Sequence, residues 1–328
     1  MNHNILVSSV GRRVGLVECV RESLNGRGRV GAIDCSRTAP AAQLVDGAWI
    51  VLPCNSAQFV SEVLDLCVRE HVSVLIPTID PELPVYAAAR GQFETAGTTV
   101  CISSTDTVRI GSDKVVTHEW LSQHGFPTVR QSSPAEVLRA KAAWALPLIV
   151  KPRNGTASIG VRLIESWQEL ELLEVTSHDC IVQEKAAGHE FTLNVYVSRE
   201  RECVCVVPHW RIEVRAGEVS KGITVKDHRL MLLGRRIAEL LPGAYGPMNI
   251  QCFMDTSGEV RVIEINPRFG GGYPLAHKAG APFTSWIIEE VEGRKLSYFD
   301  GWQDGLAMLR YDDAVYVRGR ALGIGRNA

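Results

Sequence analysis

The chain has 328 residues, of which 45% are hydrophobic, and its formal net charge is −2 at pH 7. This length exceeds one average domain, so the sequence predicts two or three domains with enough apolar residues for packed cores. The near-neutral charge offers no broad basic surface for nucleic acid. No apolar run is long enough to span a bilayer, so we expect no membrane partner.

The N-terminal segment and the cysteines indicate a cytoplasmic location. The sequence MNHNILVSSVGRR has a short apolar run with its arginine pair after it, which is the reverse of a secretion signal. The 9 cysteines are too sparse for a disulfide scaffold, and no C-x-x-C spacing occurs. Cys203 and Cys205 share one face of a predicted strand, which favours two small hydrophobic side chains over a zinc pair.

The first hundred residues alternate between short apolar runs and helical patterns. Apolar residues recur at helical spacing from Val14 to Leu24, and a second helix is predicted over residues 56–69. Strands that alternate with helices predict an open, mostly parallel α/β sheet. The predicted strands cover residues 4–10, 31–34, 49–53, 72–76 and 98–103.

Acidic residues at two strand ends are candidate ligand contacts. Asp34 ends the second predicted strand, where an NAD-binding protein would bind ribose, but the preceding loop has only Gly11 and Gly15. The G-x-G-x-x-G fingerprint is therefore absent, and a dehydrogenase is disfavoured. Asp80 and Glu82 follow another strand at its carboxyl end, where open sheets place ligands. They could contact a substrate amine, although a solvated loop is the favoured interpretation.

From residue 113 the pattern changes to that of a second domain. Lys151 ends an apolar strand, where an ammonium is costly unless an anion pairs with it. The loop after it is rich in glycines and small residues, so its free amides could close over phosphates, although a plain hairpin tip has the same composition. The predicted elements are a helix over residues 113–121, a helix over 134–143, a strand over 146–151 and the loop over 153–161.

The next apolar strand covers residues 179–184 and is followed by the sequence Lys185-Ala186. A nucleotide base could lie against the backbone of residues 184–186, and Glu190 could accept hydrogen bonds from ribose hydroxyls. Residues 191–207 predict two more strands, and residues 230–241 predict a helix.

Between those elements, residues 211–226 predict a connection that bears glycine and serine. Two interpretations of its cations stay open: they belong to a solvated loop, or they lie beside a metal site and hold an anionic substrate or a γ-phosphate. The cations are Arg211, Arg215, Lys221 and Lys226.

The stretch from Asn249 to Gly272 predicts a hairpin around the turn Thr256-Ser257-Gly258. Because side chains alternate along a strand, Glu264 and Asn266 point to one face, and Gln251 on the partner strand reaches that face. One carboxylate and two amide oxygens form a hard-oxygen cluster suited to magnesium. An edge hairpin with a solvated polar face is the alternative.

Arg268 follows this hairpin, and the run Gly270-Gly271-Gly272 comes directly after it. We expect the glycines to expose backbone amides beside the metal cluster, where phosphate oxygens would be held. A last helix is predicted over residues 283–292.

These segments, in this order, resemble the ATP-grasp superfamily, and within it the carbamoyl-phosphate synthetase large subunit and its stand-alone relatives. The matching segments cover residues 113 to about 280 and are Asp113-Lys114, Ile149-Val150-Lys151-Pro152 with its glycine loop, VQEKAAGHEFT, GPMNIQ and IEINPR. The resemblance implies an α/β (α+β grasp) fold with a Rossmann-like N-terminal domain. The implied boundaries are a pre-ATP-grasp domain at 1–110, a small lid subdomain at 111–190 and a large subdomain with the metal site at 191–328.

The resemblance also implies a role for each matching residue, with ATP as the nucleotide and Mg²⁺, or Mn²⁺ in its place, as the metal. The implied phosphate-binding residues are Lys114 and Lys151, with Ser158 and Gly160 in the closing loop. The implied base and ribose contacts are Glu184, Lys185, Ala186 and Glu190. The implied metal ligands are Gln251, Glu264 and Asn266, and Arg268 is the implied arginine of phosphoryl transfer.

Two departures from the family pattern matter. Gln251 stands where many relatives have a carboxylate, so Glu264 is the only anionic ligand in the hairpin and ATP oxygens must complete the metal site. The sequence also has one grasp unit, with no second copy, no amidotransferase domain and no biotin-type lysine motif. We therefore do not expect a complete carbamoyl-phosphate synthetase or biotin carboxylase.

The resemblance implies an ATP- and Mg²⁺-dependent carboxylate-amine ligase that acts through an acylphosphate on small, amino-acid-like substrates. We expect Arg215 and Arg268 to hold the acid substrate, with Lys221 beside them. The alternatives are phosphorylation of bicarbonate or carbamate, as in half of a carbamoyl-phosphate synthetase, and an ATP-binding regulatory protein without chemistry. The expected partners are the small-molecule carboxylate and amine, and the resemblance allows a homodimer.

Overall fold

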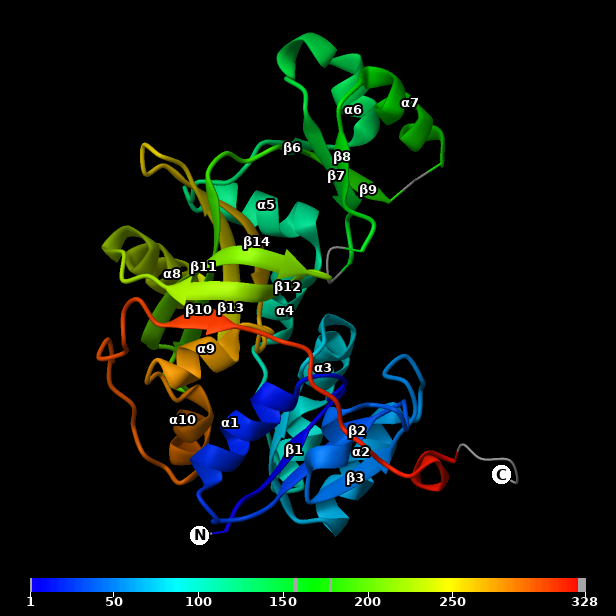
Figure 1. The fold of residues 1–328 in the computed structure, drawn as a ribbon, viewed down its shortest axis with the longest axis vertical. Coiled ribbons are helices and arrows are strands. Elements are labelled where there is room, and N and C mark those ends of the chain that lie inside the picture. The colour runs from blue at the N-terminus through cyan, green and yellow to red at the C-terminus, as the bar shows by residue number, and fades with distance from the viewer. Residues whose placement is uncertain (1, 156–158, 177–178, 324–328) are drawn as a thin grey trace.

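The computed structural model describes residues 2–155, 159–176 and 179–323, and its strands form three sheets (Figure 1). Each sheet belongs to a different part of the chain. A parallel sheet lies in the N-terminal domain, a small antiparallel sheet lies in a lid that projects from the rest of the molecule, and a larger antiparallel sheet lies in the body. This mixed α/β architecture confirms the predicted fold class.

The N-terminal sheet is parallel, as the sequence predicts, with the strand order β3-β2-β1-β4-β5. The chain adds strands on one side of β1 and then returns to add β4 and β5 on the other side. The carboxyl ends of β1 and β4 therefore form the switch point where open α/β sheets bind ligands. The elements are β1 (Asn4–Val7), α1 (Val14–Leu24), β2 (Val30–Asp34), η1 (Ala41–Leu44), β3 (Gly47–Ile50), α2 (Phe59–Arg69), β4 (Val72–Ile76), η2 (Asp80–Glu82), α3 (Leu83–Thr95) and β5 (Thr99–Val100).

The loops at this switch point are held by the carboxylate of Glu82, which is 0% exposed. It accepts hydrogen bonds from the hydroxyls of Ser8 and Ser9, at 2.6 and 2.7 Å, and from the backbone amides of Thr78 and Ile79. Burial raises its pKa, and these donors oppose the rise. Glu82 is therefore not a solvated loop residue. Its two oxygens are also occupied by hydrogen bonds from the protein, so they are not available to bind a substrate amine.

The lid is an antiparallel sheet with the strand order β6-β9-β7-β8 and two helices on it. Its own apolar core includes Trp144, Leu148, Val150 and Val182. Its elements are β6 (Gln131–Ser132), α6 (Pro134–Arg139), η3 (Lys141–Ala143), β7 (Leu148–Pro152), β8 (Arg162–Ile164), α7 (Trp167–Thr176) and β9 (Cys180–Glu184).

The large sheet is antiparallel, with the strand order β14-β13-β10-β11-β12-β15. Helices α4 and α5 contact β14 at one edge of this sheet, and α8 covers β10 and β11. Its elements are α4 (Thr105–Ser112), α5 (Lys114–Gln123), β10 (His189–Val197), β11 (Cys203–Arg215), β12 (Glu218–Thr224), α8 (His228–Leu240), β13 (Gly246–Met254), β14 (Val260–Asn266), α9 (Tyr273–Lys278), α10 (Phe283–Val291), β15 (Ala307–Leu309) and the short η4 (Gly319–Leu322).

The prediction of a connection over residues 211–226 is wrong. The strand β11 extends to Arg215, and β12 begins at Glu218. The turn between them is Ala216-Gly217, with positive φ angles of 48° and 78° that match the right-handed twist of a tight hairpin. The alternation of polar and apolar residues on these strands is the sequence signal for them.

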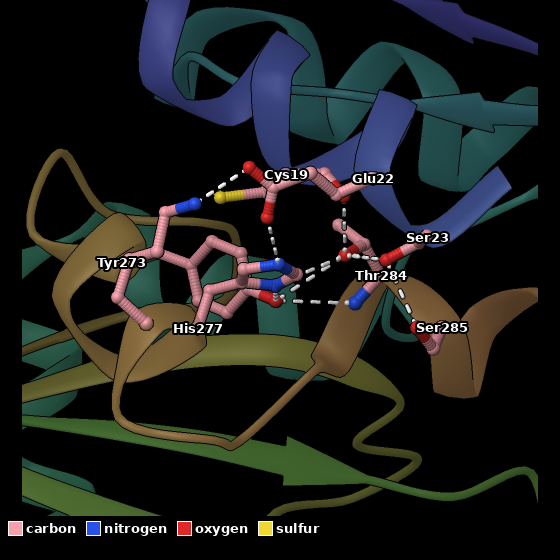
Figure 2. A network of polar contacts seen from close by, with 8 residues as sticks. Cys19, Glu22, Ser23, Tyr273, His277, Thr284 and Ser285 are labelled. Carbon is pink, nitrogen blue, oxygen red and sulfur yellow. Dashed lines mark hydrogen bonds and ion pairs between the residues drawn. The ribbon is translucent and has the colours of Figure 1, made fainter. Parts of the chain in front are cut away.

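Helix α1 of the N-terminal domain is joined to α9 and α10 of the large subdomain by polar contacts (Figure 2). The hydroxyls of Ser23 and Thr284 are 2.7 Å apart, and His277 Nε2 lies 3.2 Å from a Glu22 carboxylate oxygen. The Tyr273 hydroxyl lies 3.1 Å from His277 Nδ1. These contacts hold the last turn of α1 against α9 and α10, and α9 begins directly after the glycine run.

We propose narrower bounds for the lid than the predicted 111–190. Trp120, Leu121 and Phe126 pack in the core that the N-terminal domain shares with the large sheet, whereas the lid core starts at Val137. The lid sheet itself spans Gln131–Glu184. The other predicted boundaries, 1–110 and 191–328, stay predictions. Among the described residues, no helix is long and apolar enough to cross a membrane.

Candidate active site

A cavity of about 440 Å³ opens between the lid, the large sheet and the N-terminal domain. A pocket of this size, lined by apolar walls and a few converging charges, is typical of a small-molecule site. It brings together predicted site residues that are far apart in the sequence. These are Lys114, Lys151, Glu184, Lys185, Ala186, Glu190, Gln251, Glu264, Asn266 and Arg268.

The hairpin β13–β14 has the register that the sequence predicts. Gln251 lies directly opposite Glu264, and Asn249 lies opposite Asn266. Directly opposite residues of an antiparallel pair share a face, so the side chains of Gln251, Glu264 and Asn266 all line the cavity. Among the described residues, no group of three or more His, Cys, Asp or Glu could hold a metal ion. The cluster is therefore one carboxylate with neutral oxygens, which suits Mg²⁺ only if a bound nucleotide supplies further oxygens.

Asn249 is a further oxygen donor that the sequence prediction missed. Its Oδ1 atom is buried without a hydrogen-bond partner among the described residues, while its Nδ2 donates to the carbonyl of Arg268. A buried acceptor without a donor fits a cation or a substrate N–H. The sequence could have indicated Asn249, because the predicted register of the hairpin places it opposite Asn266.

Lys114 and Lys151 lie at the lid side of the cavity, and both are buried, with exposures of 8% and 6%. Lys114 Nζ donates to the carbonyl of Gly155 at 2.9 Å, so it is tied to the glycine loop. The side-chain ammonium of Lys151 makes no hydrogen bond or ion pair with the described residues, whereas its backbone is paired with β9. Burial lowers its pKa to about 8, which the charge of Glu264 only partly offsets.

The lowered pKa of Lys151 predicts that ATP affinity depends on pH. Below pH 8 the ammonium is charged and can pair with phosphate, whereas above it the amine is neutral, so affinity should fall as the pH rises through 8. At pH 8 ATP binding should take up protons. Calorimetry in two buffers of different ionisation enthalpy measures this uptake. Lys151→Arg should abolish it, and an equal uptake in that variant would contradict the assignment.

The predicted base and ribose contacts also line the cavity. Glu184, Lys185 and Ala186 follow the end of β9. The Glu190 carboxylate lies 3.2 Å from Arg211 Nε. Burial raises the pKa of Glu190, and the charge of Arg211 opposes the rise. The position of these groups is consistent with the predicted roles, which stay predictions.

Arg268 links the large subdomain to the N-terminal domain. Its Nε and Nη2 atoms donate to the two carboxylate oxygens of Asp80, at 2.7 and 2.5 Å. Nη2 also lies 3.3 Å from Asn266 Oδ1. A bidentate pair holds the guanidinium in one orientation beside the oxygen cluster. Asp80 therefore positions Arg268, and it is not a solvated loop residue.

The glycine run lines the cavity, its predicted role in holding phosphate stays a prediction, and the structure shows a second reason for the glycines. A Cβ atom at Gly270, Gly271 or Gly272 would lie 2.5–2.8 Å from the side chains of Asn249, Glu218 or His209 respectively. The missing side chains therefore let these polar groups pack against the loop. The run lines the cavity, but it is needed first for this close approach.

Two residues predicted as catalytic lie outside the cavity. Arg215 is at the exposed end of β11 and pairs with Asp312 at 3.2 Å, and Lys221 pairs with Glu213 at 2.6 Å. Both pairs are largely exposed, and neither cation lines the cavity. The reason is that residues 211–226 are paired strands and not a loop that can fold over the metal cluster. Gly160 is exposed and does not line the cavity either, and Ser158 lies outside the described residues.

Arg215→Ala and Lys221→Ala should therefore change ADP formation by less than about 2-fold, since exposed ion pairs contribute little. A steady-state assay of each variant checks this. A loss of more than about 10-fold in either variant would return that residue to the site.

The structure adds His209 and Arg13 to the site. His209 is 0% exposed, and Nδ1 lies 3.0 Å from Asn194 Nδ2, an N–H donor, so the neutral ring carries its proton on Nε2. Burial, with the charges of Arg211 and Arg310, lowers its pKa to about 3. Nε2 has no partner among the described residues and belongs to a cavity-lining side chain. It is therefore a free hydrogen-bond donor.

Comparison with known families agrees with this geometry. Residues 111–272 match the model described as ATP-grasp domain, and residues 5–101 match the model described as PylC-like, N-terminal domain. The fold and site thus define a nucleotide-binding protein of the grasp type with an α/β domain before it. The chain belongs to the ATP-grasp superfamily.

Individual relatives are distant. The carbamoyl phosphate synthase large chain of Thermotoga sp. (strain RQ2) is 21% identical over 285 residues, which cover 79% of this chain and 26% of that protein. The D-alanine–D-alanine ligase of Mycobacterium avium (strain 104) is 28% identical over 177 residues, covering 48% of this chain and 47% of the ligase. This chain thus spans about a quarter of the first of these relatives and about half of the second.

Among solved structures, the chain is similar in fold to the biotin carboxylase domain dimer of Hydrogenobacter thermophilus 2-oxoglutarate carboxylase, which was solved with MgADP, ADP and bicarbonate. The TM-score is 0.75 at 17% identity, and the match covers 94% of this chain and 73% of that chain. At this identity the similarity establishes the fold alone.

Proposed function

We propose that this chain is an ATP- and Mg²⁺-dependent carboxylate-amine ligase that forms an acylphosphate and then an amide. The observation that carries this proposal is Lys151, a buried ammonium without a partner among the described residues, in one cavity with the oxygen cluster of β13–β14. A buried cation of this kind needs an anionic ligand. The names of the relatives, which include ligases, support the same reaction class.

The residues suit phosphate transfer between oxygens. Lys114 and Lys151 face the nucleotide phosphates, and their charge offsets the crowding of negative groups when a carboxylate approaches ATP. Gln251, Glu264 and Asn266, with Asn249 beside them, fit a hard divalent cation. Bound Mg²⁺ would neutralise phosphate charge and orient the nucleotide.

In the first step a carboxylate oxygen attacks the γ-phosphorus, the bond to the β-phosphate oxygen breaks, and ADP leaves. Arg268, held by Asp80, stabilises the charge that spreads over the transferring phosphoryl group. In the second step a neutral amine attacks the acyl carbon, phosphate leaves with the electron pair of the broken C–O bond, and the nitrogen loses a proton to give the amide.

A panel of carboxylates and amines, assayed for ADP release with MgATP, tests the proposal. We expect release only when an acid and an amine are both present. Release with bicarbonate alone would favour the carbamoyl-phosphate type of reaction. Tight ATP binding with no ADP formed over the whole panel would favour a regulatory protein. A homodimer stays a prediction, which light scattering checks.

A further inference from the structure

Arg13 is the cavity-lining arginine that has no carboxylate partner. It is the residue directly before α1, and its side chain makes no hydrogen bond or ion pair with the described residues. In contrast, Arg268 pairs with Asp80 and Arg211 pairs with Glu190. A cavity-lining guanidinium without a partner fits an anionic group of a ligand.

Arg13 lines the cavity from the N-terminal domain, whereas Lys151 lines it from strand β7 of the lid. The charged groups that act on it are Arg268, Glu218, Asp80 and Glu82. Those that act on Lys151 are Glu264, Lys114 and Glu190, and Arg268 is coupled to both Glu264 and Asp80. Arg268 pairs with Asp80 of the N-terminal domain and lies 3.3 Å from Asn266 of the oxygen cluster, so it stands between that cluster and the domain that carries Arg13.

The surroundings of Arg13 hold its backbone in place. Glu82 fixes the loop between β1 and α1 through Ser8 and Ser9. The polar contact of α1 with α9 and α10 fixes the helix that follows Arg13 (Figure 2). A Cβ atom on Gly15 would lie 3.0 Å from Pro274, so the first turns of α1 and α9 pack closely. The guanidinium is thus carried on a preorganised frame, as a binding subsite requires.

We propose that Arg13 binds the carboxylate of the amine substrate, so that the amine is an amino acid and the product is a peptide-type bond whose amino component keeps a free carboxylate. This inference rests on the proposed ligase function. The acid that forms the acylphosphate must reach the γ-phosphate, which lies with Lys151 and Glu264, so it occupies the other side of Arg268. An amino acid on Arg13 places its amine, one carbon away from its carboxylate, toward Arg268.

Two further observations agree with this assignment. Burial, followed by the positive charge of Arg268, lowers the pKa of Arg13 to about 10, and the charges of Glu218, Asp80 and Glu82 only partly oppose this, so burial of the guanidinium without a paired anion is costly. His209 lines the same cavity, and its buried Nε2–H has no partner among the described residues. Its pKa of about 3 keeps the ring neutral at working pH, which leaves Arg13 as the charged contact.

The test compares Arg13→Ala with Arg12→Ala, because Arg12 is the exposed neighbour that does not line the cavity. With the acid and ATP saturating, Arg13→Ala should raise the KM for the amino acid about 10- to 100-fold, as expected for loss of charge-assisted hydrogen bonds. Arg12→Ala should leave that KM within about 2-fold. Arg13→Lys should recover part of the loss.

Replacing the amino acid separates the two substrates. Hydroxylamine traps the acylphosphate as a hydroxamate and has no carboxylate, so Arg13→Ala should lose far less with it than with the amino acid. The amide of the amino acid, which also has no carboxylate, should react at similar rates with wild type and Arg13→Ala.

Equal losses with hydroxylamine and amino acid, or an unchanged KM for the amino acid, would overturn the role of Arg13. Absence of hydroxamate in the wild type over the whole acid panel would instead overturn the proposed ligase function. Thermal denaturation confirms that each variant is folded.

Discussion

Glu264→Gln is expected to reduce ADP formation by at least about 100-fold, because the substitution keeps the size of the side chain but removes the only carboxylate from the oxygen cluster. Glu264 lies opposite Gln251 in the hairpin, and its other neighbours in the cluster, Asn249 and Asn266, are neutral amides. A neutral cluster should bind Mg²⁺ weakly. The measurement is ADP release at saturating ATP over a range of Mg²⁺ concentrations, and the apparent Mg²⁺ requirement should rise with the loss of rate.

Glu259→Gln is the matched control for Glu264→Gln. Glu259 lies at the turn of the same hairpin, where it is more than half exposed and pairs with Arg261 at 3.0 Å. This control should keep wild-type activity, since the pair is at the surface. Turnover within a few-fold of wild type in Glu264→Gln would refute the metal assignment.

Lys151→Ala is expected to raise the KM for ATP about 10- to 100-fold, because we propose the buried ammonium as a contact of the nucleotide phosphates. The same change should not destabilise the apoprotein. Burial lowers the pKa of Lys151 from 10.5 to about 8. Between these two pH values the unfolded chain binds the proton more readily than the folded protein, so this group lowers the free energy of unfolding as the pH falls from about 10.5 towards 8. The measurements are the KM for ATP and the thermal midpoint without nucleotide.

Lys141→Ala is the control for Lys151→Ala. Lys141 is on the same lid, and it pairs with Glu171 at 2.5 Å on the surface. It should leave the KM for ATP unchanged. An unchanged KM in Lys151→Ala, or a large drop in its thermal midpoint, would remove Lys151 from the phosphate site.

The hairpin site could be predicted from the sequence because its determinants are local. A period of two along the strand puts Glu264 and Asn266 on one face, and a short turn sets the register that brings Gln251 opposite. Lys151 could be predicted for a related reason, since a cation inside an apolar strand signals its own need for an anion. The parallel N-terminal sheet followed from the alternation of strands and helices.

The rest of the site depends on contacts between distant parts of the chain. The sequence around Arg13 has no pattern that marks it as a site residue. It lines the cavity only because the fold brings it near Arg268 and Glu218 of another domain. The composition of the glycine run predicts free amides. It does not predict the side chains that pack against the glycines, because these come from the distant strands β11, β12 and β13. The strands at Arg215 and Lys221 were mistaken for a loop because Ala216-Gly217 is a very short turn between polar residues.

A crystal structure with Mn²⁺ and a non-hydrolysable ATP analogue tests the central claim most directly, since the anomalous signal locates the metal without assumptions about the fold. The account predicts a metal peak bonded to the Glu264 carboxylate, at about 2.2 Å, with phosphate oxygens completing its coordination and contacting Lys151. A nucleotide bound elsewhere, with the β13–β14 face empty and Lys151 still unpaired, would contradict it.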